Sequence, residues 1–197
     1  MTVIGITGGT GAGKTTALEA VRQLGGVILD CDVIYHELLE SDQQLLGQIR
    51  AHFPDAFPDG KFDRKALGAI VFQDPGALAD LTAITGRYVC QEVQGRLAEY
   101  EAQGIALAAI DAIGLFESGL AASCDVTVAI TAPRELRAER IMAREHISRE
   151  YALLRIDAQK SDRYFADHCD RVIENDGTMT REEFTAKCLN IFSQYTA

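Results

Sequence analysis

A glycine-rich stretch near the start of the chain holds the residues whose spacing most clearly predicts chemistry. Residues 8–15 satisfy the pattern G-x-x-x-x-G-K-[ST]. Glycines let a backbone bend until several N–H groups face one anion, and a helix beginning at Lys14 adds its positive end there. The lysine can reach β- and γ-phosphates, and the Thr15 hydroxyl can bind Mg²⁺. An incidental glycine-rich turn is the alternative, but the complete pattern favours a nucleoside triphosphate site.

Most residues of this loop are expected to contact the nucleotide. The expected set is Gly9, Thr10, Gly11, Ala12, Gly13, Lys14, Thr15 and Thr16. Lys14 is expected to act in catalysis as well, and Thr15 to be the metal ligand. The loop does not indicate which molecule receives the phosphoryl group.

Two acidic residues follow the second short apolar run, residues 27–29. Ligands of doubly wound sheets gather outside the ends of such strands. A carboxylate at Asp30 or Asp32 could therefore accept the proton of an attacking hydroxyl. A pair of solvated turn residues, with Asp32 as the N-cap of the next helix, explains the same pattern. The residues alone leave both interpretations open.

A third acid, Asp111, follows the apolar run of residues 105–110. Its place after a strand predicts a role in ordering Mg²⁺ or the substrate, and a turn aspartate is the alternative. Glu117 lies slightly further on and is, by itself, an ordinary carboxylate at a helix start.

Arginines concentrate in one segment, because seven of the fourteen lie between residues 134 and 163. Arg137, Arg140 and Arg144 share one helical face, which favours a lid that covers a bound triphosphate. A solvated helix pair whose arginines meet nearby glutamates is the alternative. It best explains Arg134 and Arg149.

The elements that position these residues alternate between strand and helix. Short apolar runs at residues 1–7, 27–29, 105–110, 126–130 and 172–173 predict strands, and Lys14–Leu24 predicts a helix. Pro133 suits the first turn of a helix, and Ser148 suits an N-cap. Thr180 and Glu183 predict a capping box before the last helix. We therefore expect an α/β fold with a mainly parallel, doubly wound sheet of about five strands.

Length and composition limit the function classes. The chain has 197 residues, is 47% hydrophobic and carries a formal charge of −10. That size predicts one core with room for an insert. The acidity disfavours nucleic-acid binding. Scattered cysteines suit reduced thiols in a cytoplasmic protein, and neither a membrane span nor a signal peptide is predicted.

Together these segments resemble the dephospho-CoA kinase family of P-loop kinases. The resemblance runs from about residue 3 to residue 177 and includes the loop and four shorter segments. These are residues 29–34, residues 115–120, the arginine segment and residues 172–175. It implies an ATP- and Mg²⁺-dependent kinase that phosphorylates the ribose 3′-hydroxyl of dephospho-CoA, the last step of coenzyme A synthesis.

The resemblance also assigns roles and boundaries. It makes Asp32 the catalytic base, Arg140 the lid arginine with Arg144 one turn further, and Asn175 to Gly177 the adenine-binding segment. It implies a nucleotide core (residues 1–32, 104–132 and 164–197), a helical substrate domain (33–103) and a lid (133–163). Glu117 and Asp111 are expected on the substrate side. We expect a monomer or weak homo-oligomer.

Two departures from the family pattern fall on the acceptor side. Gly86-Arg87 stands in place of His-Pro, and Ile113-Gly114-Leu115 in place of Pro-Leu-Leu. Arg87 is expected to replace a lost phosphate contact. Asp162 and Phe165 also stand where basic residues are expected near the adenine.

Two rival functions remain open on the sequence alone. One is another P-loop small-molecule kinase, for nucleosides or nucleoside monophosphates. The other is a GTP-dependent switch, suggested by D-x-x-G at residues 111–114 and by Gln159-Lys160-Ser161-Asp162. The latter segment ends a helical pattern, whereas a guanine-reading motif must follow a strand.

Overall fold

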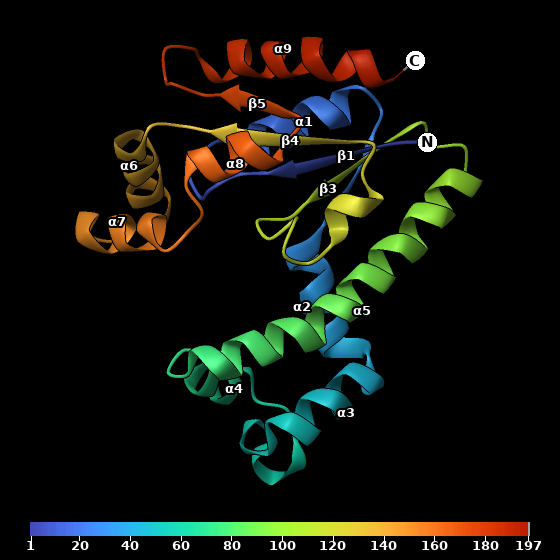
Figure 1. The fold of residues 1–197 in the computed structure, drawn as a ribbon, viewed down its shortest axis with the longest axis vertical. Helices are drawn as coiled ribbons and strands as arrows, with labels where there is room; N and C mark the ends of the chain where they lie inside the picture. Colours follow the sequence, from blue (N-terminus) through green and yellow to red (C-terminus); the bar gives the residue numbers. More distant parts are fainter. Residues whose placement is uncertain (197) are drawn as a thin grey trace. The chain divides into compact units, whose positions relative to one another are not determined.

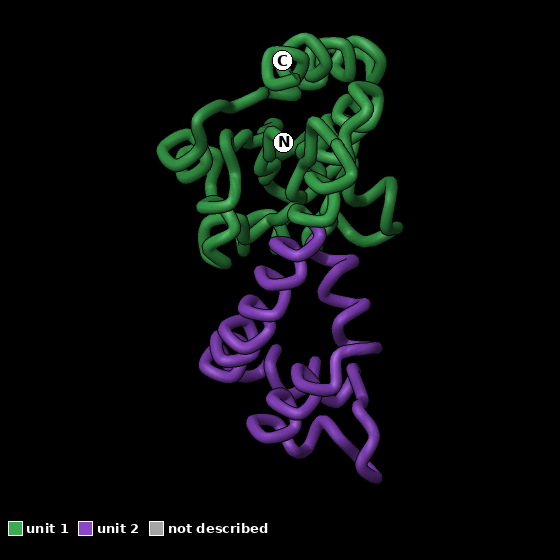
Figure 2. Tube along the Cα trace, turned by 90° about the vertical axis from the view of Figure 1, so that its right-hand side faces the viewer, with its two compact units in different colours: residues 1–30, 97–197 green, residues 31–96 purple. Residues whose placement is uncertain are grey.

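Strands alternate with single helices or runs of helices along the chain in the computed structural model, which describes residues 1–196 (Figure 1). The chain divides into two compact units, coloured separately in Figure 2. Unit 1 comprises residues 1–30 and 97–197, and unit 2 comprises residues 31–96.

Unit 1 is built on a five-stranded sheet in which every neighbouring pair is parallel. Its strands are β1 (Thr2–Thr7), β2 (Val27–Asp30), β3 (Leu107–Asp111), β4 (Val126–Thr131) and β5 (Arg171–Glu174), in the order β2-β3-β1-β4-β5. The predicted fold class, a parallel α/β sheet of about five strands, is confirmed.

The third strand begins two residues later than expected, at Leu107. The reason is the end of the preceding helix. Gly104 has a φ of 78°, and the Ile105 N–H donates to the Tyr100 carbonyl at 3.0 Å. This glycine closure holds Ile105 in the helix-ending turn, so its β-branched side chain does not start the strand.

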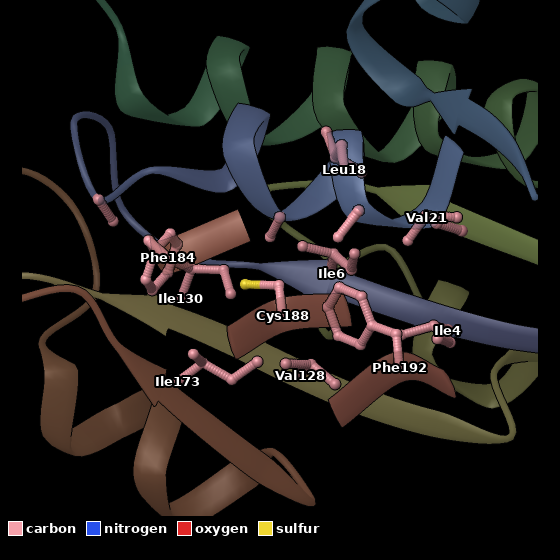
Figure 3. Packing of buried hydrophobic residues seen from close by; sticks show 14 of the residues in the cluster. Ile4, Ile6, Leu18, Val21, Val128, Ile130, Ile173, Phe184, Cys188 and Phe192 are labelled. Atoms are coloured by element: carbon pink, nitrogen blue, oxygen red, sulfur yellow. The ribbon is translucent and has the colours of Figure 1, made fainter. Parts of the chain in front are cut away.

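One face of the sheet is covered by α1 (Lys14–Gln23) and α9 (Arg181–Phe192) (Figure 3). Ile4 and Ile6 of β1 are fully buried there, together with Cys188 and Phe192 of α9. The capping box is confirmed: Glu183 N–H donates to Thr180 Oγ1 at 3.2 Å, and Thr180 N–H donates to Glu183 Oε2 at 2.8 Å. Because Cys188 and Phe192 are fully buried, the last helix belongs to the core.

A smaller cluster joins the two helices of the arginine segment, α6 (Arg134–Glu145) and α7 (Arg149–Asp157). Its buried members are Ala138, Ile141, Ala152 and Ile156. The Ser148 hydroxyl accepts from the Tyr151 N–H at 3.2 Å, which confirms the predicted N-cap. Pro133 lies one residue before α6 and not in its first turn. The helix α8 (Asp162–His168) follows α7.

Unit 2 is helical, with no strand among its residues. It contains α2 (Cys31–Ser41), α3 (Gln43–His52), α4 (Arg64–Val71), two short 3₁₀ turns (Pro54–Ala56 and Pro58–Gly60) and most of α5 (Pro75–Ala102). The capping interpretation of Asp32 is wrong, because α2 already begins at Cys31 and Asp32 lies inside its first turn. Unit 2 ends at Arg96, inside α5, whereas the predicted substrate domain ends at residue 103.

None of the helices described over residues 1–196 is long and apolar enough to cross a membrane.

Candidate active site

The glycine-rich loop joins β1 to α1, as its pattern requires. Gly8, Gly11 and Gly13 have φ values of 136°, 81° and 109°, a region that favours glycine. A Cβ on Gly8 would overlap the carbonyl oxygen of Ile130, and one on Gly13 would overlap Asn175 Nδ2. Backbone conformation and close packing therefore both require glycine at these two positions.

The loop leaves a set of backbone N–H groups open beside the start of α1. The Ala12 N–H closes a turn onto the Gly9 carbonyl at 3.1 Å. Among the described residues, the N–H groups of Gly11, Gly13, Lys14 and Thr15 form no hydrogen bond. Such a nest at a helix N-terminus is an anion-binding arrangement. The residues present therefore fit a polyphosphate.

Lys14 bends back over this loop. Its Nζ donates to the Gly8 carbonyl at 3.3 Å and lies 3.9 Å from Asp111 Oδ1. Parallel register also pairs Asp111 with Asp30 across β3 and β2. The structure thus brings together Lys14, Asp111 and Asp30 at the carboxyl end of the sheet.

Arg140 reaches the loop from α6 but contacts its carbonyls. Nη1 donates to the Gly11 carbonyl at 3.2 Å and to the Ala12 carbonyl at 3.4 Å, and Nη2 donates to Asn175 Oδ1 at 3.1 Å. Burial lowers the pKa of this guanidinium. The Asn175 side chain in turn donates to the Ala12 carbonyl at 3.0 Å, which ties the residues after β5 to the loop.

The lid arginines separate into two groups. Arg137 and Arg140 point at the loop, and Arg137 is only 4% exposed. Arg144 lies outside, where its Nη2 pairs with Glu145 Oε1 at 2.6 Å. Arg134 pairs with Asp157 at 2.6 Å and Arg149 pairs with Glu135 at 2.5 Å, so the ion-pair interpretation describes these two.

The remaining predicted residues occupy varied environments. Thr15 is exposed at the first turn of α1. Glu117 accepts from the Tyr164 hydroxyl at 3.2 Å and pairs with Lys160 at 3.4 Å. Gly177 has a φ of 85°, and a Cβ there would meet Leu136.

Two candidates belong to unit 2. Asp32 lies in the first turn of α2, beside a cavity of about 410 Å³ that it lines with Val33, His36, Glu37 and Glu40. Arg87 is exposed on α5.

A cavity of about 240 Å³ adjoins the loop within unit 1. It lies where the chain after β5 meets the start of α1. Its lining residues are Gly13, Thr16, Arg140, Asn175, Met179, Thr180, Arg181 and Phe184.

Gln159 is a site residue that sequence reasoning missed. Its side chain makes hydrogen bonds of 2.9 Å and 2.7 Å with the N–H and the hydroxyl of Thr10. The sequence drew attention to it only as part of an imperfect guanine-reading motif. That motif runs from the segment after α7 into the first residue of α8 and follows no strand. Nothing in the local pattern links positions so far apart in the chain.

A sequence model of one kinase family, described as dephospho-CoA kinase, matches residues 2–181. The chain belongs to this dephospho-CoA kinase family. A dephospho-CoA kinase of Anaeromyxobacter dehalogenans is 39% identical over 179 residues, which cover 90% of this chain and 85% of the relative. A dephospho-CoA kinase of Latilactobacillus sakei is 36% identical over 177 residues, which cover 89% of this chain and 88% of the relative.

Solved structures agree with the dephospho-CoA kinase assignment. The dephospho-CoA kinase from Campylobacter jejuni superimposes with a TM-score of 0.69 at 25% identity, covering 98% of this chain and 96% of that one. Shikimate kinase from Bacteroides thetaiotaomicron has a TM-score of 0.61 at 14% identity, covering 98% of this chain and 97% of that one. This likeness shows a shared fold alone.

Family membership decides between the functions that the sequence left open. The chain is a phosphotransferase of the dephospho-CoA kinase type, which acts in the final step of coenzyme A biosynthesis in a family of ATP-dependent kinases. The nucleoside kinase and GTP-switch alternatives are therefore set aside.

Proposed function

We propose that the chain transfers the γ-phosphoryl group of ATP to the ribose 3′-hydroxyl of dephospho-CoA, giving coenzyme A and ADP. The observation that carries the donor half is the loop itself. Its open N–H groups lie beside Lys14, which is close to Asp111 at the carboxyl end of the sheet. This arrangement supports catalysis by positioning and by neutralising charge on the transferring group.

On the donor side, the loop between Gly9 and Thr16 binds the phosphates through its open N–H groups, those of Gly11, Gly13, Lys14 and Thr15. Lys14 is the proposed cation for these phosphates, because its Nζ already lies over the loop at the Gly8 carbonyl. Arg140 is the proposed catalytic lid arginine, because its guanidinium already lies at the loop, whereas Arg144 extends the lid one turn further. A guanidinium suits phosphate because its parallel N–H groups match two oxygens.

A Mg²⁺ ion fits the oxygen donors present. Thr15 offers a hydroxyl at the start of α1, and Asp111 offers a carboxylate at the end of β3. When bound, the ion neutralises negative charge on the β- and γ-phosphates. We assign Thr15 as the protein ligand.

The adenine is proposed to bind in the 240 Å³ cavity near Asn175 and Gly177. Asn175 holds the Ala12 carbonyl from one side, and Thr16 and Met179 line the same space. The cavity therefore adjoins the loop directly, as a nucleotide whose phosphates lie on the loop requires.

Asp32 is the proposed base. It follows the end of β2 by two residues, so the chain itself keeps it near the sheet edge where ligands of such folds gather. Its carboxylate would accept the proton of the attacking hydroxyl. Asp111, Glu117 and Arg87 are the further candidates for acceptor binding. We expect the active form to be a monomer or weak homo-oligomer.

Turnover of dephospho-CoA with ATP and Mg²⁺ tests this proposal, with Asp32→Asn as the key variant. Loss of the carboxylate should lower kcat roughly 10²–10⁴-fold while both substrates still bind. Asp30→Asn is the matched control, two residues away at the end of β2. A larger loss of kcat in the Asp30 variant would reject Asp32 as the base. Absence of 3′-phosphorylation by the parent protein would reject the function.

A further inference from the structure

Two side chains take up every polar group of Thr10, in the middle of the phosphate loop. Gln159 Oε1 accepts from the Thr10 N–H at 2.9 Å, and Gln159 Nε2 donates to Thr10 Oγ1 at 2.7 Å. Arg137 Nε donates to the Thr10 carbonyl at 2.9 Å. Arg137 Nη2 also donates to Gln159 Oε1 at 2.8 Å, which closes a ring of three residues.

The ring is anchored below the surface by Arg137, whereas Thr10 and Gln159 are half-buried. Arg137 is 4% exposed, and its burial lowers the pKa of the guanidinium. The negative charges of Asp162 and Asp157 act in the opposite direction and raise this pKa. Asp162 Oδ1 lies 3.9 Å from Nη1. A guanidinium this buried is stable only where acceptors satisfy its N–H groups. Here the Thr10 carbonyl accepts from Nε, and Gln159 Oε1 accepts from Nη2.

Gly9 shows how closely Arg137 is packed against the loop. The three atoms nearest to a Cβ built on Gly9 all belong to the Arg137 guanidinium, and they are too close to accommodate it. The φ of Gly9 is not positive, so backbone strain does not exclude a side chain. Arg137 itself therefore requires glycine at position 9.

We propose that Gln159 is a positioning residue for phosphoryl transfer. Together with Arg137 it fixes Thr10, so that the open N–H groups of the following residues stay aimed at the phosphates of ATP. This inference rests on the proposed function for the identity of the bound anion. It also makes Arg137 a support of the loop, whereas the sequence suggested a lid arginine that contacts phosphate.

The carboxamide is the group that this position needs. Gln159 receives two N–H groups on one oxygen and donates to one hydroxyl from its nitrogen, without adding charge beside a bound anion. Methionine has a similar length but supplies no comparable hydrogen bonds. Gln159→Met therefore removes the ring and preserves most of the volume.

The test compares Gln159→Met with Gln48→Met, a change at an exposed glutamine of α3. Equilibrium binding of ADP, the KM for each substrate and thermal midpoints are measured. Loss of hydrogen bonds to a loop that binds an anion should weaken ADP binding and raise the ATP KM roughly five- to thirty-fold. The dephospho-CoA KM should stay unchanged in both variants.

A second set of variants tests whether the ring acts as a unit. Arg137→Met should weaken ADP binding, and adding Gln159→Met should then cost far less than it does in the parent protein. Gly9→Ala should likewise cost less in the Arg137→Met protein, because the guanidinium that meets the new methyl group is gone. Should Arg137→Met fail to fold, the single Gln159 variant still decides the question.

Three results would overturn the inference. They are ADP binding by Gln159→Met equal to that of Gln48→Met, a raised dephospho-CoA KM with normal ADP binding, and strict additivity of Gln159→Met and Arg137→Met. Because ADP binding needs no acceptor, these readouts stay meaningful even if the parent protein fails to phosphorylate dephospho-CoA.

Discussion

The phosphate loop and the helical unit place their candidate residues in opposite settings. Around the loop, four side chains from distant parts of the chain form hydrogen bonds to loop atoms. They belong to Asn175, Arg140, Arg137 and Gln159. In unit 2, Arg87 is exposed on its helix. The difference indicates that side chains from several elements of unit 1 hold the loop of the donor site in place. An exposed side chain of the helical unit, such as Arg87, can change with less effect on the fold.

The largest expected effect comes from the residue with the most direct part in phosphate binding. Lys14→Ala should lower kcat/KM by an amount equivalent to ~3–4 kcal/mol, because it removes a charged donor aimed at developing negative charge. Steady-state kinetics measure the loss, and Lys65→Ala on α4 of unit 2 serves as the control. Near-normal turnover of Lys14→Ala would contradict the prediction that the phosphate loop is more sensitive to substitution than an exposed position of unit 2.

Asn175→Ala sharpens the comparison by removing a support of the loop. The side chain donates to the Ala12 carbonyl and accepts from Arg140, so its loss removes two hydrogen bonds that tie the residues after β5 to the loop. We expect a decrease of about 1–3 kcal/mol in the free energy of unfolding, together with weaker ADP binding. Urea denaturation measures the first quantity, and Asn190→Ala on α9 is the control. Unchanged stability and ADP binding would contradict the role of Asn175.

Arg87→Ala should have the smallest effect and confine it to the acceptor. We expect a raised KM for dephospho-CoA, with ATP affinity and thermal midpoint unchanged, because Arg87 is an exposed residue of α5. Kinetics with each substrate varied in turn provide the measurement, and Arg50→Ala on α3 is the comparison. An unaltered acceptor KM would exclude Arg87 from the site.

The sequence predicted the parts of the site that depend on neighbouring residues. Glycines, lysine and threonine in fixed order define the loop, and β-branched runs define the strands that flank it. Asp111 was found because a strand end is a local signal. The capping of the last helix was likewise predictable, since both partners lie three residues apart.

Contacts between distant segments could not be predicted. Arg137, Arg140 and Arg144 share spacing on one helix, yet only the packing of α6 against the loop distinguishes the first two from the third. Gln159 is separated from Thr10 by most of the chain, and glutamine after a helix carries no signal of its own. The start of α2 was misjudged because strand and helix follow each other there without an intervening loop.

The last helix, α9, lies almost entirely beyond the residues that the family model matches. The match of the family model ends at residue 181, yet Phe184, Cys188 and Phe192 beyond it are almost wholly inaccessible to solvent. A chain truncated at that boundary would leave α1 uncovered along one side. The core of unit 1 therefore extends beyond the residues by which the family model recognises the chain.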